Sequence, residues 1–231
     1  MLIIRRYEII LVIIIFILTG SLVIVSKGTE NMHYLNHRYP YCVALTFDDG
    51  PYPEYTEKLL DILENENVRA TFFVIGRHVE KYPNLTKLIT EKKHEIGGHT
   101  YTHKNITHLE NFDLFSELEN TRMAIQKATG INTYLFRPPG GQFNYKVTNF
   151  ISQLGYKTVL WDVLPKDHEP SKTSKEITKF VIENTKPDDI VLLHLGREPT
   201  LEALPEIIWQ LRLKGYRFVT ISELLAKQKN N

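Results

Sequence analysis

"VALTFDDGPYP", residues 43–53, runs from an apolar segment into two adjacent aspartates and a Gly-Pro break. Adjacent carboxylates repel each other when both are ionised, so the pairing of Asp48 with Asp49 requires an explanation. Turn formation accounts for an aspartate before Gly-Pro, whereas a metal or catalytic site would account for both. The stretch alone leaves these two interpretations open.

Short β-rich runs alternate with helical segments from residue 41 onward. The runs read CVALTF, ATFFVIG, HEIGG, TYLFR, KTVLWD, DIVLLH and YRFVT. Segments 113–128 and 200–213 repeat apolar residues at helical spacing, and Gly130, Gly155 and Gly215 each follow a predicted helix. This alternation predicts a parallel sheet with helices outside it. An open doubly wound sheet and a barrel both satisfy the pattern.

Ionisable residues follow the ends of five predicted strands, and their placement favours the barrel. In barrels, functional groups from many strands gather around the C-terminal mouth, whereas an open sheet concentrates them near one switch point. We therefore predict an α/β fold, a distorted (β/α) barrel with about seven parallel strands. The ionisable residues are Asp48, Asp49, His99, His103, Arg137, Asp162, Asp167 and His194.

The N-terminal run IILVIIIFILTGSLVIV, residues 9–25, carries no charged residue and reaches the low end of membrane-spanning lengths. Arg5 and Arg6 precede it, which predicts a cytoplasmic N-terminus and an exported remainder. We favour an uncleaved signal anchor over residues 1–25, one transmembrane helix, then a polar stalk over 26–39 and a catalytic domain over 40–231. The expected location is the cell membrane with an extracellular domain; secretion after signal cleavage is the alternative.

The composition is that of an ordinary globular protein, with 231 residues, 42% hydrophobic and 24% charged. A formal charge of +1 gives no electrostatic footprint for nucleic acid. The single cysteine, Cys42, excludes an internal disulfide and is expected to pack as a small hydrophobe. We expect a monomer.

The segment HTYTH places His99 and His103 four positions apart. On a helical turn this spacing puts both imidazoles on one face, where they can hold one metal ion; two surface histidines in a polar loop are the alternative. Two histidines and one aspartate would supply three ligands and leave positions open for water and substrate, as in catalytic zinc sites. The second aspartate of the pair would then be a candidate general base. His194 is a candidate general acid or a buried strand-ending histidine.

Five segments in this order, TFDDG, HTYTH, RPPGG, WDVLPKDH and IVLLH, resemble the motifs of the polysaccharide deacetylases, carbohydrate esterase family 4. The resemblance extends from about residue 40 to about residue 226. It implies a distorted barrel of β/α units that removes N-acetyl groups from a polysaccharide containing N-acetylglucosamine. Peptidoglycan and chitin-like polymers are the implied substrates. An O-acetyl esterase and an inactive carbohydrate-binding protein are the alternatives.

By position, the resemblance implies a role for each site residue. Asp48 would be the general base, oriented and kept ionised by Arg137, and His194 would be the general acid, paired with Asp167. The divalent metal would be zinc, with cobalt or nickel possible, and its ligands would be Asp49, His99 and His103. The oxyanion and acetyl pocket would be formed by Gly140, Leu192 and Trp161.

Two positions depart from the family pattern. Gly140 stands where the family often has an aromatic residue, so the backbone N–H donor is kept and a groove wall is lost. His168 stands where a tryptophan usually follows the aspartate of the fourth motif. The second departure makes the acetyl pocket less apolar, and it bears on the assignment of Asp167, in preference to Asp162, as the carboxylate of this motif.

Overall fold

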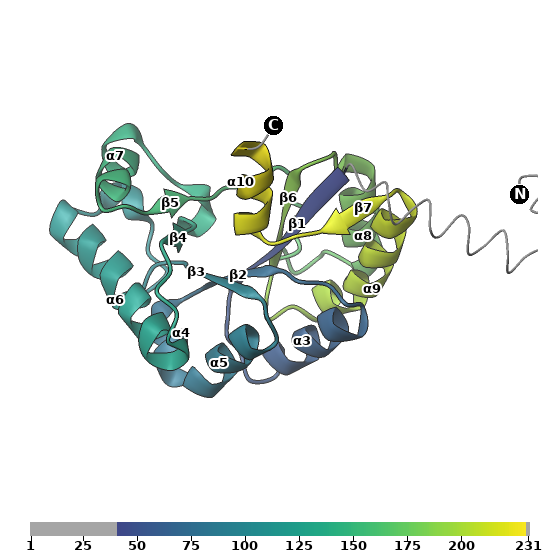
Figure 1. Cartoon of the computed structure of the whole chain (residues 1–231), viewed down its shortest axis with the longest axis horizontal. Coiled ribbons are helices and arrows are strands. Elements are labelled where there is room, and N and C mark those ends of the chain that lie inside the picture. Colours follow the sequence, from purple (N-terminus) through teal and green to yellow (C-terminus); the bar gives the residue numbers. More distant parts are fainter. Residues whose placement is uncertain (1–40, 230–231) are drawn as a thin grey trace, which may run out of the picture. The chain divides into compact units, whose positions relative to one another are not determined.

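The structure is a computed structural model and describes residues 41–229 (Figure 1). The signal anchor over 1–25 and the stalk over 26–39 lie outside the described residues and stay predictions. Within residues 41–229, no helix combines the length and apolar character needed to cross a membrane.

Strands and helices alternate along the described chain, as the sequence predicts. The strands are β1 (Tyr41–Asp49), β2 (Thr71–Val74), β3 (Glu95–Gly98), β4 (Leu135–Phe136), β5 (Lys157–Thr158), β6 (Asp189–His194) and β7 (Tyr216–Phe218). The α-helices are α3 (Thr56–Asn65), α4 (Gly76–Lys81), α5 (Pro83–Glu91), α6 (Asn111–Thr129), α7 (Tyr145–Gln153), α8 (Ser174–Asn184), α9 (Glu198–Leu213) and α10 (Ile221–Lys229). Two 3₁₀ turns are η1 (Ile106–His108) and η2 (Pro139–Gly141).

All strand pairs in the sheet are parallel, in the order β5-β4-β3-β2-β1-β6. Strand β1 is central: β6 runs along one of its edges, and the opposite edge is shared by β7 near its start and β2 near its end. After β5 the chain reaches the edge of β6 that faces away from β1, where Val163 forms a bridge with Val191 of β6. The sheet is therefore curled into an incomplete barrel, which confirms the predicted parallel (β/α) arrangement.

Side chains of β1 alternate between two apolar layers, because successive residues of a strand point to opposite faces. Val43, Leu45 and Phe47 pack outward in the cluster that includes residues of α3, α5 and α9. Cys42 and Ala44 pack inward in a cluster with residues of α10, which lies across the concave side of the sheet (Figure 1). Cys42 is 1% exposed, as expected for a small hydrophobe. The next inward positions of β1 are polar and lead to the mouth.

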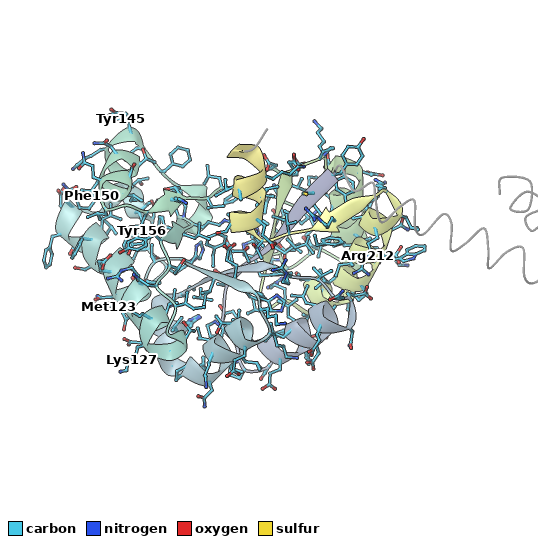
Figure 2. The ribbon with its side chains drawn as sticks, in the orientation of Figure 1. Met123, Lys127, Tyr145, Phe150, Tyr156 and Arg212 are labelled. Carbon is cyan, nitrogen blue, oxygen red and sulfur yellow. The ribbon has the colours of Figure 1, made fainter. Side chains whose placement is uncertain are left out.

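A third cluster joins α6 and α7 to strand β4. Tyr156 belongs to it and Phe150 packs against it (Figure 2). Helix α6 ends at Gly130, whose φ of 77° lies in the left-handed region that favours glycine. Helix α6 extends the predicted segment 113–128 by two residues at its start and one at its end, and α9 extends the segment 200–213 by two residues at its start.

Candidate active site

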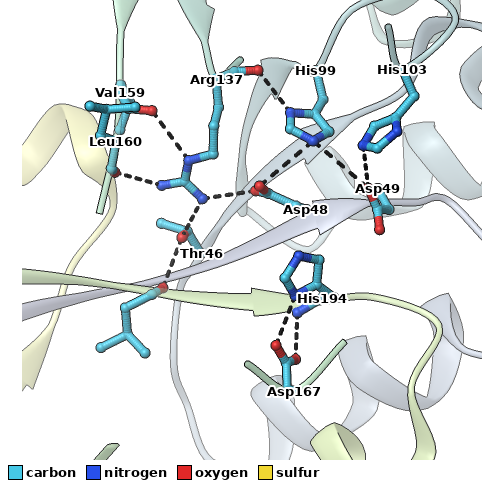
Figure 3. Close-up of polar contacts among 11 residues, drawn as sticks. Thr46, Asp48, Asp49, His99, His103, Arg137, Val159, Leu160, Asp167 and His194 are labelled. Atoms are coloured by element: carbon cyan, nitrogen blue, oxygen red, sulfur yellow. Dashed lines mark hydrogen bonds and ion pairs between the residues drawn. The ribbon is translucent and has the colours of Figure 1, made fainter. Parts of the chain in front are cut away.

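The C-terminal ends of the parallel strands bring the predicted ionisable residues to one mouth of the barrel (Figure 3). Asp48 and Asp49 end β1, and His194 ends β6. The loop after β3 carries His99 and His103, Arg137 follows β4, and Asp167 follows β5. This placement agrees with the argument by which the sequence favoured a barrel.

Asp49, His99 and His103 form a compact group of ligand atoms, all within 4.8 Å of one another. Oδ1 of Asp49 lies 3.3 Å from Nε2 of His103 and 3.8 Å from Nε2 of His99. The His99 side chain is 2% exposed, whereas that of His103 is 41% exposed. The group therefore has one ligand, His99, in the protein interior and another, His103, that faces solvent.

The loop that carries the two histidines is not the helical turn that their spacing predicted. His99 and His103 lie in an irregular segment in which Thr100 has a φ of 58° and His103 a φ of 62°. These left-handed residues turn the chain so that the two imidazole centroids lie 5.0 Å apart. Asp49 also has a positive φ, 86°. Such strained backbone persists only where the surrounding structure holds it.

Glu117 of α6 holds this loop in place. Its Oε2 accepts hydrogen bonds from the backbone N–H groups of Tyr101 and Thr102, both at 2.7 Å, and its Oε1 accepts one from the Thr102 hydroxyl at 2.5 Å. The side chain is buried, so these bonds are shielded from competing water. The buried carboxylate thus fixes the two residues directly before His103.

The protonation of the triad suits a divalent metal. Nδ1 of His99 lies 2.8 Å from the carbonyl oxygen of Arg137, so Nδ1 carries the proton and Nε2 presents its lone pair toward Asp49. Burial lowers the pKa of His99, although Asp48 and Asp49 oppose the shift, and favours the neutral ring. Burial raises the pKa of Asp49, but the hydrogen bond with His103 and the nearby histidines outweigh it and lower the pKa overall. Two imidazoles and a carboxylate are a donor set that fits zinc, cobalt or nickel.

Arg137 crosses the inside of the barrel to Asp48. Its Nη1 donates hydrogen bonds to Asp48 Oδ1 at 2.8 Å and to the Thr46 hydroxyl at 2.7 Å. The remaining donors reach the carbonyl oxygens of Val159 at 3.3 Å and Leu160 at 3.0 Å. The guanidinium is completely buried and lies 4.2 Å from the Phe73 ring centroid. The carboxylate of Asp48 thus has a fixed, buried cation beside it.

Asp167 holds both the imidazole and the backbone of His194. Nδ1 of His194 lies 2.8 Å from Asp167 Oδ1, and its backbone N–H donates to Oδ2 at 2.7 Å. The Thr200 hydroxyl also donates to Oδ2 at 2.7 Å. Burial by itself lowers the pKa of His194, but the hydrogen bond to Asp167 and the charges of Asp167, Asp48 and Asp49 outweigh it and raise the pKa.

Asp167, which the sequence predicts as the partner of His194, and Asp162 have different surroundings. Asp162 is exposed, and its Oδ2 accepts a hydrogen bond from the Ile190 backbone N–H at 2.9 Å. Asp167 is completely buried and contacts His194 directly. The structure thus brings Asp167, and not Asp162, to the histidine.

The remaining predicted residues lie around the same mouth. Leu192 is 2% exposed and pairs with Thr46 in the parallel register, one inward position before His194. Gly140 is exposed, with a φ of 62° in η2. The Trp161 ring lies against the next glycine, because a Cβ on Gly141 would meet the indole at 2.5 Å. This close approach explains why that position is glycine.

Sequence reasoning missed four residues that support the site. Each acts through a contact between segments far apart in the chain, so no local pattern marked it. The residues are Thr46, Phe73, Glu117 and Thr200.

The comparisons with known proteins agree with this geometry. The family model described as polysaccharide deacetylase matches residues 36–159. A peptidoglycan-N-acetylglucosamine deacetylase of Bacillus cereus is 40% identical over 209 residues, which cover 87% of this chain and 98% of that protein.

Two solved structures share the fold. One, named "T48 deacetylase with substrate", has a TM-score of 0.77 and 38% identity, and the match covers 81% of this chain and 92% of that one. The other is described as a mutant of a CE4 family pseudoenzyme with restored enzymatic activity; it has a TM-score of 0.76 and 34% identity, covering 80% and 67% of the two chains. The name of the second describes the parent protein as a pseudoenzyme. From the family match, the identity and the shared fold, the chain belongs to the polysaccharide deacetylases, carbohydrate esterase family 4.

Proposed function

We propose that the protein is a metal-dependent deacetylase that removes the acetyl group from N-acetylglucosamine residues of peptidoglycan. The observation that carries this proposal is the placement of an Arg137-bound carboxylate, Asp48, between a three-ligand group and a carboxylate-bound histidine, His194. Amide hydrolysis needs a base, a means of stabilising the oxyanion and an acid. Asp48 would be the base, an ion held by the three-ligand group would stabilise the oxyanion, and His194 would be the acid.

Asp48 is suited to act as the general base. Oδ1 accepts the hydrogen bond from Arg137 at 2.8 Å, and Oδ2 lies 3.7 Å from Nε2 of His99. Because that nitrogen carries no proton in the tautomer described above, Oδ2 keeps a lone pair for a proton taken from water. The buried Arg137 side chain also fixes the orientation of the carboxylate.

Asp49, His99 and His103 would hold the divalent ion, which when bound supplies Lewis acidity to the scissile acetamide. The Nδ1 hydrogen bond of His99 to the Arg137 carbonyl fixes the orientation of one ligand. The same arginine thus orients the base with its side chain and a ligand with its backbone.

His194 is suited to act as the general acid. Water adds to the acetamide carbon as Asp48 accepts a proton; the C–N bond then breaks as the histidine gives a proton to the departing nitrogen. The products are acetate and a free amine on the sugar. Asp167 holds Nδ1 of His194, so the other ring nitrogen is the one that faces the mouth. The backbone N–H of Gly140 is the protein donor proposed for the oxyanion.

The substrate proposal is supported by the Bacillus cereus relative, whose name specifies N-acetylglucosamine of peptidoglycan. Acetate release should be measured with the metal-loaded protein on peptidoglycan, chitin oligomers and an O-acetylated polysaccharide. We expect release from peptidoglycan, with free amines on glucosamine. Release from the O-acetylated polymer alone would support an esterase, and binding without release would support an inactive carbohydrate-binding protein.

The role of His194 as an acid can be tested by comparing the effect of its substitution on an amide and on an ester substrate. An amine leaves poorly unless it is protonated, whereas the phenolate of an aryl acetate leaves with little help. His194→Ala should therefore lose roughly 10²–10⁴-fold in rate on the N-acetyl substrate and much less on an aryl acetate. Equal losses on both substrates would mean that the histidine positions the substrate instead of donating a proton.

We further propose that residues 9–25 anchor the protein in the cell membrane with the catalytic domain outside. The uncharged run and the preceding Arg5 and Arg6 support this. The full chain should sediment with membranes and resist extraction by salt. Recovery of a shortened chain from the medium would indicate a cleaved signal peptide and a secreted enzyme.

A further inference from the structure

Asp167, His168 and His194 form a second group of metal-ligating side chains beside the mouth, with ligand atoms within 4.8 Å of one another. The set of donors, two imidazoles and one carboxylate, is the same as that of the proposed catalytic site. The imidazole of His168 lies edge-on to that of His194, with centroids 4.8 Å apart and ring planes at 63°. His168 is also the residue that replaces a tryptophan of the family pattern.

The contact between Asp167 and His194 has dimensions that a metal ion can use. Oδ1 and Nδ1 lie 2.8 Å apart. Ligands at about 2.0–2.1 Å from a tetrahedral zinc ion lie roughly 3.3 Å from each other, so a small opening of this contact would admit the ion. The proton on Nδ1 would be released to solvent.

Access and charge also favour a cation here. His168 is exposed, so an ion can enter from solvent, whereas Asp167 is completely buried and pre-oriented by the Thr200 hydroxyl and the His194 backbone N–H. Asp48 and Asp49 lie close enough to interact electrostatically with His194. Arg137 offsets the charge of Asp48, so the carboxylate that attracts a cation to this site is that of Asp167.

We propose that Asp167, His168 and His194 form a second, inhibitory divalent-metal site. Zinc bound there would take the place of the proton on Nδ1 of His194. The proton on the other ring nitrogen would then belong to a neutral, zinc-bound imidazole, which gives up a proton far less readily than the imidazolium of a general acid. Metal would therefore activate the protein at the first site and inhibit it at the second. The inhibitory consequence rests on the proposed function, whereas the existence of the site does not.

The site is tested with zinc alone, without substrate. The full chain, freed of metal by a chelator, is dialysed against increasing Zn²⁺, and bound zinc is counted for the wild type, His168→Phe and His108→Phe. His108 is likewise exposed, so its variant controls for loss of a surface histidine. We expect His168→Phe to bind one zinc fewer per chain than the wild type and His108→Phe to match it. Equal zinc counts for the wild type and His168→Phe would overturn the proposal.

A second readout tests the consequence for activity. Within each protein, the rate at excess zinc is divided by its own rate at one equivalent, which removes any effect of the substitution on the basal rate. For the wild type and His108→Phe, the rate at excess zinc should be at least about tenfold lower than the rate at one equivalent, because a positioned acid contributes roughly 10²–10⁴-fold. For His168→Phe, the two rates should be nearly equal. His168→Trp, which restores the family residue, should behave like His168→Phe. If excess zinc inhibits His168→Phe and His168→Trp as strongly as the wild type, inhibition through this site is contradicted, even if the zinc counts differ.

Discussion

Asp48 of β1 and His194 of β6 are register partners on adjacent parallel strands. Neighbouring strands lie about 4.7–4.9 Å apart, and both residues occupy inward positions at the mouth. Each is held by a different partner: Arg137 lies 2.8 Å from Asp48, and Asp167 lies 2.8 Å from His194. A candidate base and a candidate acid with a raised pKa thus lie side by side, which is the pairing that acid–base hydrolysis requires.

The two adjacent aspartates should fail in different ways when substituted. Asp48→Asn should keep the metal but lose roughly 10²–10⁴-fold in rate, because the base is gone while the three ligands remain. Asp49→Ala should lose the metal, because it removes one of three protein ligands. Metal content and acetate release measured on the same samples check this. Metal loss in Asp48→Asn with retention in Asp49→Ala would reverse the two roles.

Arg137 should contribute strongly to stability through its buried pair with Asp48. Arg137→Met leaves a buried carboxylate without its cation, which should cost roughly 3–5 kcal/mol of unfolding free energy, measured by urea denaturation of the full chain. Arg212→Met is the matched control, because Arg212 pairs with Glu66 at 2.8 Å with side chains 39% and 31% exposed. A loss below about 1 kcal/mol in both variants, typical of exposed pairs, would contradict this account of Arg137.

Asp167 should set the basic limb of the pH profile. A general acid must be protonated, so activity falls as the pH rises through the pKa of His194. Burial lowers that pKa, and the hydrogen bond and charge of Asp167 are the main causes that raise it. Asp167→Asn should therefore move the basic limb of kcat/KM to lower pH.

Asp162→Asn is the control for this shift, because Asp162 also follows β5 but bonds to the Ile190 backbone N–H. Its basic limb should stay in place. If Asp162→Asn moves the limb and Asp167→Asn does not, the acid is not the histidine bound by Asp167.

The repeating pattern and the five motifs made the fold predictable from sequence, together with the gathering of the candidate site residues at one mouth. Alternation of strand and helix is a local signal, and the C-terminal ends of parallel strands necessarily share one edge. The conformation of the histidine loop was not predictable. Four-residue spacing suggests a helical turn, but Glu117 of a distant helix holds residues 101 and 102 in an irregular path, with positive φ at Thr100.

The buried supports of the site were equally hidden from the sequence. Thr46 and Thr200 are ordinary residues in their own segments and acquire roles only when the barrel brings Arg137 and Asp167 to them. The choice between Asp162 and Asp167 depended in the same way on which side chain reaches β6. Such contacts depend on the tertiary fold and leave no periodic signal.

Glu117 should control metal affinity without touching the metal. Glu117→Ala frees the backbone N–H groups before His103, so zinc affinity should fall by roughly 10–100-fold, as for other residues that orient metal ligands. Glu119→Ala is the matched control: Glu119 lies on the same helix but bonds to Arg122 and Tyr156. Competition with a chromogenic chelator gives both affinities. Equal affinities in the two variants would mean that the loop holds its shape without Glu117.

The most direct test of the central claim is the chemical state of glucosamine in peptidoglycan treated with the zinc-loaded full chain. Muropeptides released after treatment are analysed by mass spectrometry for loss of the acetyl group on each sugar, with zinc-loaded Asp48→Asn as the matched inactive control. We predict free amines on glucosamine residues, one acetate released for each, and neither product with Asp48→Asn. Fully acetylated glucosamine after treatment with the wild type, while zinc remains bound to it, would contradict the account.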